Sequence, residues 1–249
     1  MTEYLLAAPV VEKKLRRRRK PLIPLTLDER LDLMKRELRV PATLDEYFAL
    51  VQDVDYIIHY RRGHIVSFIE LDEQVDEQNR RLPMGQAAPL HERLTLLVGQ
   101  LISNLLGIPQ SAYQGYGSNI KVYVEGAKNA YNPDLAFTKG EGTFERVLPL
   151  ERKRRTQVLT NPHILVEVLS ESTRDFDLYE KWDDYQKIES LRQMIFIEQD
   201  GINIKTYIKQ SVNRWMYIEL KDIKDKLPIF DSEETIALSD IYSVHTLTR

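Results

Sequence analysis

A single carboxylate interrupts an otherwise apolar segment in the second half of the chain. Residues Ile164–Leu169 are apolar and rich in β-branched side chains, which predicts a strand buried on both faces, and Glu167 lies within it. An ionised carboxylate in such a position costs on the order of several kcal/mol unless a cation or hydrogen-bond donors compensate it. Glu167 is therefore a candidate functional residue.

Three polar residues recur at intervals of four shortly after this strand. Asp177, Lys181 and Tyr185 follow the polar turn Ser170–Thr173, and their spacing places them on one face of a helix predicted over residues 177–189. The same stripe is also typical of a surface salt bridge, which contributes only a few tenths of a kcal/mol, roughly. A buried acid that leads into this stripe favours a functional site.

A second carboxylate, Asp134, stands at the entrance of another predicted strand. Pro133 fixes the backbone directly before the apolar residues Leu135–Phe137. Aspartate after proline is also ordinary turn chemistry, so this residue alone does not identify a ligand. Two carboxylates on adjacent strands with a lysine nearby, however, make a hard-oxygen site suited to Mg²⁺ or Mn²⁺. We therefore expect Asp134 and Glu167 to lie within reach of one common cation.

The order of these residues resembles that of a known family. The pair Pro133–Asp134, the segment Glu167–Ser170 and the later Ser-Thr, Asp, Lys and Tyr positions are similar to the putative restriction endonuclease family abundant in cyanobacteria, which belongs to the PD-(D/E)XK nuclease-like superfamily. The likeness runs from about Ala42 to the C-terminus. It implies an α/β fold with a restriction-endonuclease-like mixed central β-sheet flanked by helices.

The resemblance also implies metal-dependent hydrolysis of DNA phosphodiester bonds, with Mg²⁺ or Mn²⁺ as the cofactor. Asp134 and Glu167 would bind one or two ions, and the backbone carbonyl of Val168 would add a ligand, as is usual in the superfamily. The metal would activate water and neutralise the charge that develops on the scissile phosphate. The expected catalytic residues are Asp134, Glu167 and Lys181, and the expected supporting residues are His91, Asp177 and Tyr185.

Three positions depart from the family pattern. Leu169 stands two residues after the glutamate, where the superfamily's name places lysine, so we expect the long side chain of Lys181 to supply this cation from the helix. His59 lies where the family's glutamate is expected, and Gln193–Ile195 replaces the usual Glu-Tyr-Trp segment. The missing strand lysine leaves an alternative open, a catalytically decayed nuclease-like fold that acts as a DNA-binding or assembly module.

If the helix lysine replaces the strand lysine, its amine must reach the two acids. We expect Lys181 to approach Asp134 and Glu167 more closely than Lys187 or Lys139 does.

The remaining segments are predicted to build the fold around these residues. The predicted helices cover residues 26–39, 43–50, with a Thr43–Glu46 capping box, and 89–106, with His91 in the first turn. A hairpin is predicted around Arg62–Gly63, a long polar connection over residues 139–160, and further strands at residues 194–199, 203–208 and 214–219.

Composition narrows the range of functions. The 249 residues include no cysteine, which excludes disulfides, thiolate metal sites and cysteine nucleophiles and fits a reducing compartment. No apolar run approaches the roughly 20 residues that span a bilayer, and the N-terminus lacks a signal-peptide pattern, so we expect a cytoplasmic protein without a membrane partner. The sequence also lacks a glycine-rich phosphate loop and a zinc-like histidine spacing. Restriction enzymes of this fold are often dimers, which makes a homodimer an expectation, although the sequence shows no interface.

Positive charge is concentrated in two blocks although the net charge is −3. We expect residues 1–24 to form a basic arm in front of a nuclease-like domain at residues 25–249, and both blocks to contact nucleic acid. Like-charge blocks are equally typical of solvated, mobile segments. The expected nucleic-acid-binding residues are Arg16, Arg17, Arg18 and Arg19 in the arm and Arg152, Lys153, Arg154 and Arg155 in the polar connection.

Deletion of residues 1–20 is expected to weaken nucleic-acid binding and to flatten its dependence on salt, because seven of the eight residues at positions 13–20 are cationic. The folded domain should remain intact, as thermal unfolding would show. Oligonucleotide binding at several salt concentrations measures the effect. Equal affinities and salt slopes in the two proteins would mean that the arm is only a solvated tail.

Overall fold

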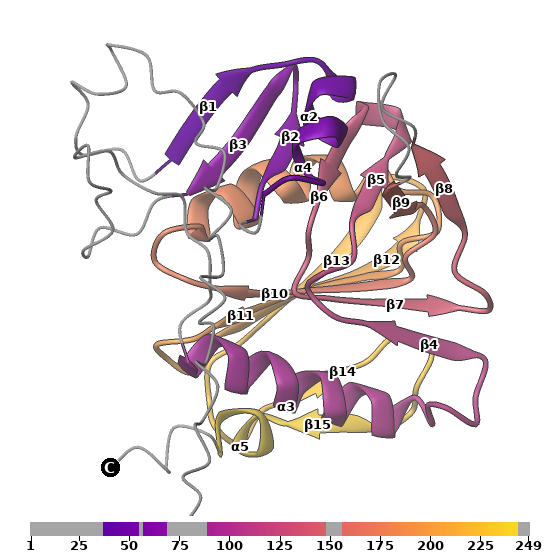
Figure 1. The fold of residues 1–249 in the computed structure, drawn as a ribbon. Coiled ribbons are helices and arrows are strands. Elements are labelled where there is room, and N and C mark those ends of the chain that lie inside the picture. The colour runs from indigo at the N-terminus through magenta and orange to yellow at the C-terminus, as the bar shows by residue number, and fades with distance from the viewer. Residues whose placement is uncertain (1–36, 55–56, 69–88, 148–155, 244–249) are drawn as a thin grey trace, which may run out of the picture.

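The computed structural model describes residues 37–54, 57–68, 89–147 and 156–243. These residues form two large mixed β-sheets, a two-stranded sheet and four α-helices, so the expected mixed α/β fold is confirmed (Figure 1). The expectation of one central sheet was incomplete, because a second large sheet packs beside the first.

The first large sheet contains both predicted acidic strands and has the strand order β13-β12-β11-β10-β7-β4. Its neighbouring strands are antiparallel except for β10 and β11, which are parallel. In chain order the strands are β4 (Tyr113–Tyr116), β7 (Leu135–Lys139), β10 (Ile164–Leu169), β11 (Gln193–Glu198), β12 (Ile204–Ser211) and β13 (Arg214–Leu220).

The second large sheet has the order β1-β3-β2-β6-β5-β9-β8, with β5 and β9 parallel and the other neighbours antiparallel. Its strands are β1 (Glu37–Pro41), β2 (His59–Arg61), β3 (His64–Phe68), β5 (Val122–Val124), β6 (Asn129–Tyr131), β8 (Phe144–Val147) and β9 (Thr156–Leu159). A 3₁₀ turn, η1 (Glu125–Ala127), joins β5 to β6.

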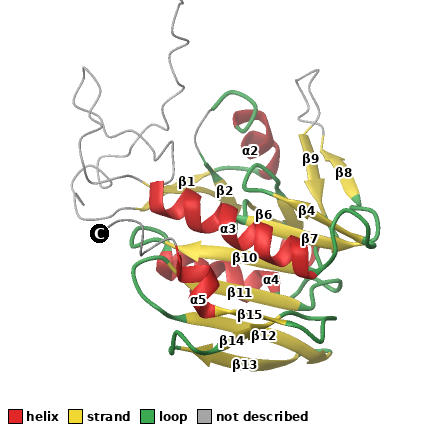
Figure 2. Ribbon diagram, turned by 90° about the horizontal axis from the view of Figure 1, so that it is seen from below, coloured by secondary structure: helices red, strands yellow, loops and turns green. Residues whose placement is uncertain are grey.

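Each face of the six-stranded sheet is covered by a different layer (Figures 1 and 2). Helix α3 (Pro89–Leu105), with α5 (Leu238–Ile241), β14 (Lys226–Pro228) and β15 (Thr235–Ala237), covers one face. The other face packs against a π-helical segment, η2 (Phe176–Lys181), its continuation α4 (Trp182–Tyr185), and residues of the seven-stranded sheet.

Strand β10 is buried along its whole length, as its apolar sequence predicted. Val166 and Val168 belong to the core under α3, whereas Leu165 and Leu169 belong to the core on the opposite side. Because side chains alternate along a strand, Glu167 shares the face of Leu165 and Leu169 and points toward η2 and α4.

Two local predictions in the first half of the chain are confirmed. Helix α2 (Leu44–Leu50) begins with the predicted capping box, in which the Thr43 hydroxyl accepts from the Glu46 N–H at 3.2 Å and the Thr43 N–H donates to the Glu46 carboxylate at 2.7 Å. Strands β2 and β3 form the predicted hairpin, where Arg62 and Gly63 adopt φ values of 48° and 79°.

Three predicted segments were wrong in part. The helix predicted over residues 26–39 does not include Glu37–Arg39, because these residues pair with β3 as strand β1; residues 26–36 lie outside the described residues. The predicted polar connection contains the antiparallel strands β8 and β9, since Val158 and Leu159 are buried in the seven-stranded sheet. The helix predicted over residues 177–189 begins with the π-helical segment and ends at Tyr185.

Both basic blocks, at residues 13–20 and 152–155, lie outside the described residues, so the predictions about them and about the arm at residues 1–24 remain predictions. Among the described helices, none combines the length and apolar character that crossing a membrane requires.

Candidate active site

Glu167 lies almost completely buried between β10 and the helical segment η2–α4. Its exposed fraction is 2%, and two side chains from the helix donate to its carboxylate. The Lys181 ammonium lies 3.0 Å from Oε1, and the Tyr185 hydroxyl donates to the same oxygen at 3.1 Å. The polar stripe that was predicted from sequence therefore faces the strand acid.

Lys181 is held by groups from three parts of the chain. Its Nζ lies 2.7 Å from Asp177 Oδ1 and 3.3 Å from the backbone oxygen of Asn132, in addition to its contact with Glu167. The Thr173 hydroxyl donates to the other oxygen of Asp177 at 2.6 Å. Asp177 and Lys181 lie in the π-helical segment, a wider turn than that of an α-helix and one that is frequent at functional sites.

The other two lysines that were compared with Lys181 contact different acids. Lys187 pairs with Asp183 and Asp184, and Lys139 pairs with Asp231. The contact between Lys181 and Glu167 agrees with the expectation that the helix lysine approaches the strand acid most closely.

Asp134 stands beside Glu167 on the neighbouring strand. Strands β7 and β10 are antiparallel, and Leu135 pairs with Val166, so Asp134 lies one position further along, level with Glu167. Its carboxylate lies just beyond the last hydrogen-bonded pair of β7 and β10. There Oδ2 accepts a hydrogen bond from the Val168 N–H at 2.7 Å.

His91 links these atoms to the first turn of α3. Its Nε2 lies 3.0 Å from the Val168 carbonyl oxygen and 3.3 Å from Asp134 Oδ2. Burial alone would lower the pKa of His91, but the hydrogen bond to Asp134 and the charge of that carboxylate outweigh it and raise the pKa. A positively charged donor is thus favoured between these two oxygen atoms.

The oxygen atoms around this point are of the chemical types that a hard divalent cation prefers. Asp134 and Glu167 supply carboxylates, Val168 supplies a carbonyl, and Mg²⁺ prefers such ligands. No group of three or more acidic, histidine or cysteine side chains in the described part of the chain is arranged to hold a metal ion. A site here therefore depends on the two carboxylates together with the backbone oxygen, and an ion held by Asp134 and Val168 would compete with His91 for these atoms.

The carboxylates of the site are destabilised in their charged form by burial and by one another. Burial raises the pKa of the Glu167 carboxyl well above its ordinary value; the Lys181 charge opposes this, and the Asp177 and Asp134 carboxylates add to it. Burial likewise raises the pKa of Asp177, against the opposing effect of Lys181. For Lys181, burial would lower the pKa, but the Asp177 and Glu167 carboxylates outweigh it and raise the pKa. The lysine therefore stays charged at neutral pH.

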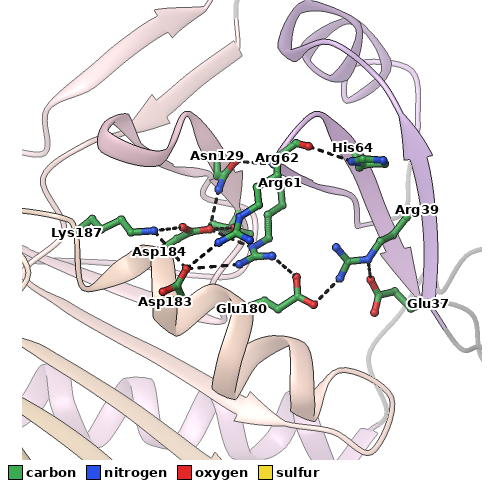
Figure 3. Close-up of polar contacts among 11 residues, drawn as sticks. Glu37, Arg39, Arg61, Arg62, His64, Asn129, Glu180, Asp183, Asp184 and Lys187 are labelled. Atoms are coloured by element: carbon green, nitrogen blue, oxygen red, sulfur yellow. Dashed lines mark hydrogen bonds and ion pairs between the residues drawn. The ribbon is translucent and has the colours of Figure 1, made fainter.

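A network of charged groups fixes the helical segment from its other side (Figure 3). Arg61, on β2, reaches Glu180 with Nη1 at 2.6 Å and Asp184 with Nε at 3.2 Å. Glu180 and Asp184 directly precede Lys181 and Tyr185 in the chain. By holding these two acids, Arg61 fixes the rotation of the helical segment that carries both donors to Glu167.

Asp184 is the most enclosed member of this network. Its side chain is 1% exposed, and its Oδ2 also accepts from Asn129 Nδ2 at 2.7 Å and from the Tyr131 hydroxyl at 2.5 Å, both on β6. Strands β2 and β6 of the seven-stranded sheet thus position the helical segment, whose Lys181 and Tyr185 side chains contact Glu167 in the six-stranded sheet.

Sequence reasoning missed Asn132 and did not assign a role to Arg61. Asn132 immediately precedes Pro133, yet its contribution is a backbone oxygen, for which side-chain identity gives no signal. Arg61 lies in the run Arg61-Arg62-Gly63, which indicates only a turn.

His59, which departs from the family pattern, is buried beside the site, and its Nδ1 accepts from the Asn132 N–H at 3.3 Å. Burial lowers the pKa of His59 well below its ordinary value, and the Lys181 and Lys121 charges lower it further.

Comparison with known proteins identifies a family and two relatives that this chain resembles. The model of the Uma2 family, described as "Putative restriction endonuclease", matches residues 72–239. The "Uncharacterized protein sll1609" of Synechocystis sp. PCC 6803 is 25% identical over 158 residues, which cover 61% of this chain and 84% of that protein. A crystal structure from Anabaena variabilis ATCC 29413, described as a putative nuclease belonging to DUF820, superposes with a TM-score of 0.53 at 16% identity, covering 88% of this chain and 98% of the other. This last similarity supports the fold.

Replacing Glu167 with Gln is expected to stabilise the metal-free protein at neutral pH. Because the folded-state pKa of Glu167 is raised, its proton-linked stability is present below about 4.5, the ordinary value, and is lost as the pH rises through the folded pKa. The glutamine variant has no such loss. Its advantage in unfolding free energy should grow as the pH rises from 5 to 8.

Denaturant unfolding in EDTA measures this effect, with Glu189→Gln, a change at an exposed site, as the matched control. The difference in unfolding free energy between Glu167→Gln and the wild type should grow with pH, while that of the control should stay constant. A Glu167→Gln protein that is equally stable or less stable at pH 8 would contradict the electrostatic account.

Replacing Arg61 with Met is expected to lower the unfolding free energy by about 1.5–3 kcal/mol, because the buried Asp184 carboxylate loses a hydrogen bond from a charged donor. The loss is limited because Lys187, Asn129 and Tyr131 still contact Asp184. Arg62→Met is the matched control, since the Arg62 side chain is 65% exposed and its loss should cost less than about 1 kcal/mol. Denaturant titrations of both variants measure the difference. Equal losses would show that the network does not depend on Arg61.

Proposed function

The chain belongs to the putative restriction endonuclease family, and from this premise we propose that it is a metal-dependent nuclease that hydrolyses phosphodiester bonds in DNA. The observation that carries the proposal is the contact between the Lys181 ammonium and Glu167 Oε1 at 3.0 Å. The strand position two residues after Glu167 holds Leu169, and the helix lysine supplies the cation that this position lacks.

In this proposal Asp134, Glu167 and the Val168 carbonyl hold one or two Mg²⁺ or Mn²⁺ ions. A bound ion of this kind activates water and neutralises charge on a phosphoryl oxygen. Both donors to Glu167 among the described residues bind Oε1, and neither binds Oε2. The carboxylate is therefore fixed in orientation while its second oxygen remains available to a cation.

Lys181 and Tyr185 have different roles in this mechanism. Lys181 stays protonated between Glu167 and Asp177, so it acts as a fixed positive charge beside the phosphate or the attacking water rather than as a base. Burial and the Glu167 charge raise the pKa of the Tyr185 hydroxyl well above its ordinary value. Tyr185 therefore remains a hydrogen-bond donor that orients Glu167.

The alternative is a decayed nuclease-like fold that retains DNA binding or an assembly role. Its strongest argument was the absence of a strand lysine, and the position of Lys181 weakens this argument. Experiment can distinguish the two functions, because only the enzyme would hydrolyse DNA in the presence of a divalent ion.

The wild-type protein is expected to cleave plasmid or oligonucleotide DNA with Mg²⁺ or Mn²⁺ and not with EDTA. Lys181→Met and Glu167→Gln should each lower the rate by roughly 10²–10³-fold, since each removes charge from the reacting centre. Lys139→Met, which replaces a lysine that pairs with Asp231 instead, should cleave at the wild-type rate. Thermal unfolding of each variant shows whether it is folded.

If the folded wild-type protein shows neither metal-dependent cleavage nor metal-dependent thermal stabilisation, the enzyme proposal is wrong. Binding of DNA without either effect would support the decayed module instead.

A further inference from the structure

A second ammonium group lies close to the site and takes no part in the mechanism described above. Lys121 directly precedes β5, and its Nζ donates to the side-chain oxygen of Asn132 at 2.7 Å. The backbone oxygen of Asn132 accepts from Lys181 Nζ at 3.3 Å. One residue, two positions before Asp134, thus lies between two lysine side chains.

The orientation of the Asn132 amide is fixed, which directs the Lys121 amine to one place. Asn132 Nδ2 donates to the backbone oxygens of Ser118 and Ile120 at 3.0 Å and 3.1 Å. The amide oxygen must therefore face Lys121.

Lys121 differs from Lys181 because it has no counter-anion. Lys181 contacts two carboxylates, whereas no carboxylate in the described part of the chain forms an ion pair with Lys121. The Lys121 amine also lies 5.9 Å from the centre of the Tyr47 ring. Burial lowers the pKa of Lys121 to about 8.

A buried ammonium group without an anion is costly in the free protein, and a bound anion would reduce that cost. An ammonium group has three N–H donors, and among the described residues Asn132 accepts a hydrogen bond from one of them. A lysine in this state is a point charge suited to a phosphate oxygen.

We propose that Lys121 binds a backbone phosphate of the nucleic-acid strand whose neighbouring phosphate reacts at the Asp134–Glu167 site. This inference rests on the proposed function and adds a substrate contact to it. Lys121 is a phosphate-binding residue in this account, and Asn132 sets its position relative to Lys181.

A purely structural role for Lys121 makes the opposite prediction for stability. If its purpose were to hold Asn132, Lys121→Met would lower the melting temperature. If it is an anion site, the substitution removes an uncompensated charge, so the melting temperature should stay the same or rise while nucleic-acid binding weakens.

The test compares wild type, Lys121→Met, Lys121→Arg and Lys221→Met, the last being a control at a side chain that is 64% exposed. Binding of a labelled DNA duplex is measured in EDTA at several salt concentrations, so that no cleavage interferes. Loss of one phosphate contact should reduce the slope of log K against log salt by about 0.9 for a duplex. We expect this reduction in Lys121→Met, and wild-type slopes in Lys121→Arg and Lys221→Met.

A second measurement separates this inference from the proposed function. Inorganic phosphate should raise the melting temperature of the wild type more than that of Lys121→Met. If phosphate acts in this way but the wild type binds no DNA, the anion site stands and the DNA substrate is wrong. A wild-type salt slope in Lys121→Met together with an unchanged phosphate effect, or a lowered melting temperature without any change in binding, would overturn the inference.

Discussion

The ammonium group of Lys181 holds two buried carboxylates, Glu167 and Asp177, and the surrounding structure keeps it there. Removing three charged groups from water is costly, and their mutual attraction compensates for this only when the geometry is well fixed. The geometry is fixed from two sides. Strand β10, buried on both faces, fixes Glu167, while Arg61 and Asp184 fix the rotation of the helical segment that carries Lys181.

This cluster of buried charges makes the folded state less stable than apolar side chains at the same positions would. Three carboxylates, those of Asp134, Glu167 and Asp177, lie around one lysine. Burial raises the pKa of Glu167, and repulsion from the other two acids raises it further. A fold selected for stability alone would place apolar residues here. Two further groups fit this interpretation. His91 places a donor between Asp134 and Val168. Lys121 places beside Asn132 a cation that has no carboxylate partner among the described residues.

The sequence predicted the elements whose structure depends on residues close together in the chain. The apolar run of β10, the capping box of α2 and the four-residue spacing of Asp177, Lys181 and Tyr185 are all readable in short windows. The family resemblance added the order of the two acids along the chain. Together they were sufficient to expect a helix lysine beside a strand acid.

Features that depend on distant pairing were not predictable in this way. Residues Glu37–Arg39 have a helical pattern but pair with β3, and β8–β9 lie within a segment that is polar overall. The contribution of Asn132 is a backbone oxygen, and that of Arg61 depends on a sheet that packs against the helix only in the folded chain. A single π-helical turn is likewise too short to leave a periodic signal in the sequence.

The most direct test of the central claim is to locate Mn²⁺ by anomalous X-ray scattering in crystals of the wild-type protein. The account predicts a peak within coordination distance of Asp134, Glu167 and the Val168 carbonyl oxygen, with the Lys181 amine still in contact with Glu167 or with a bound water. A peak elsewhere, no peak at saturating Mn²⁺, or a Lys181 side chain directed away from Glu167 would contradict it.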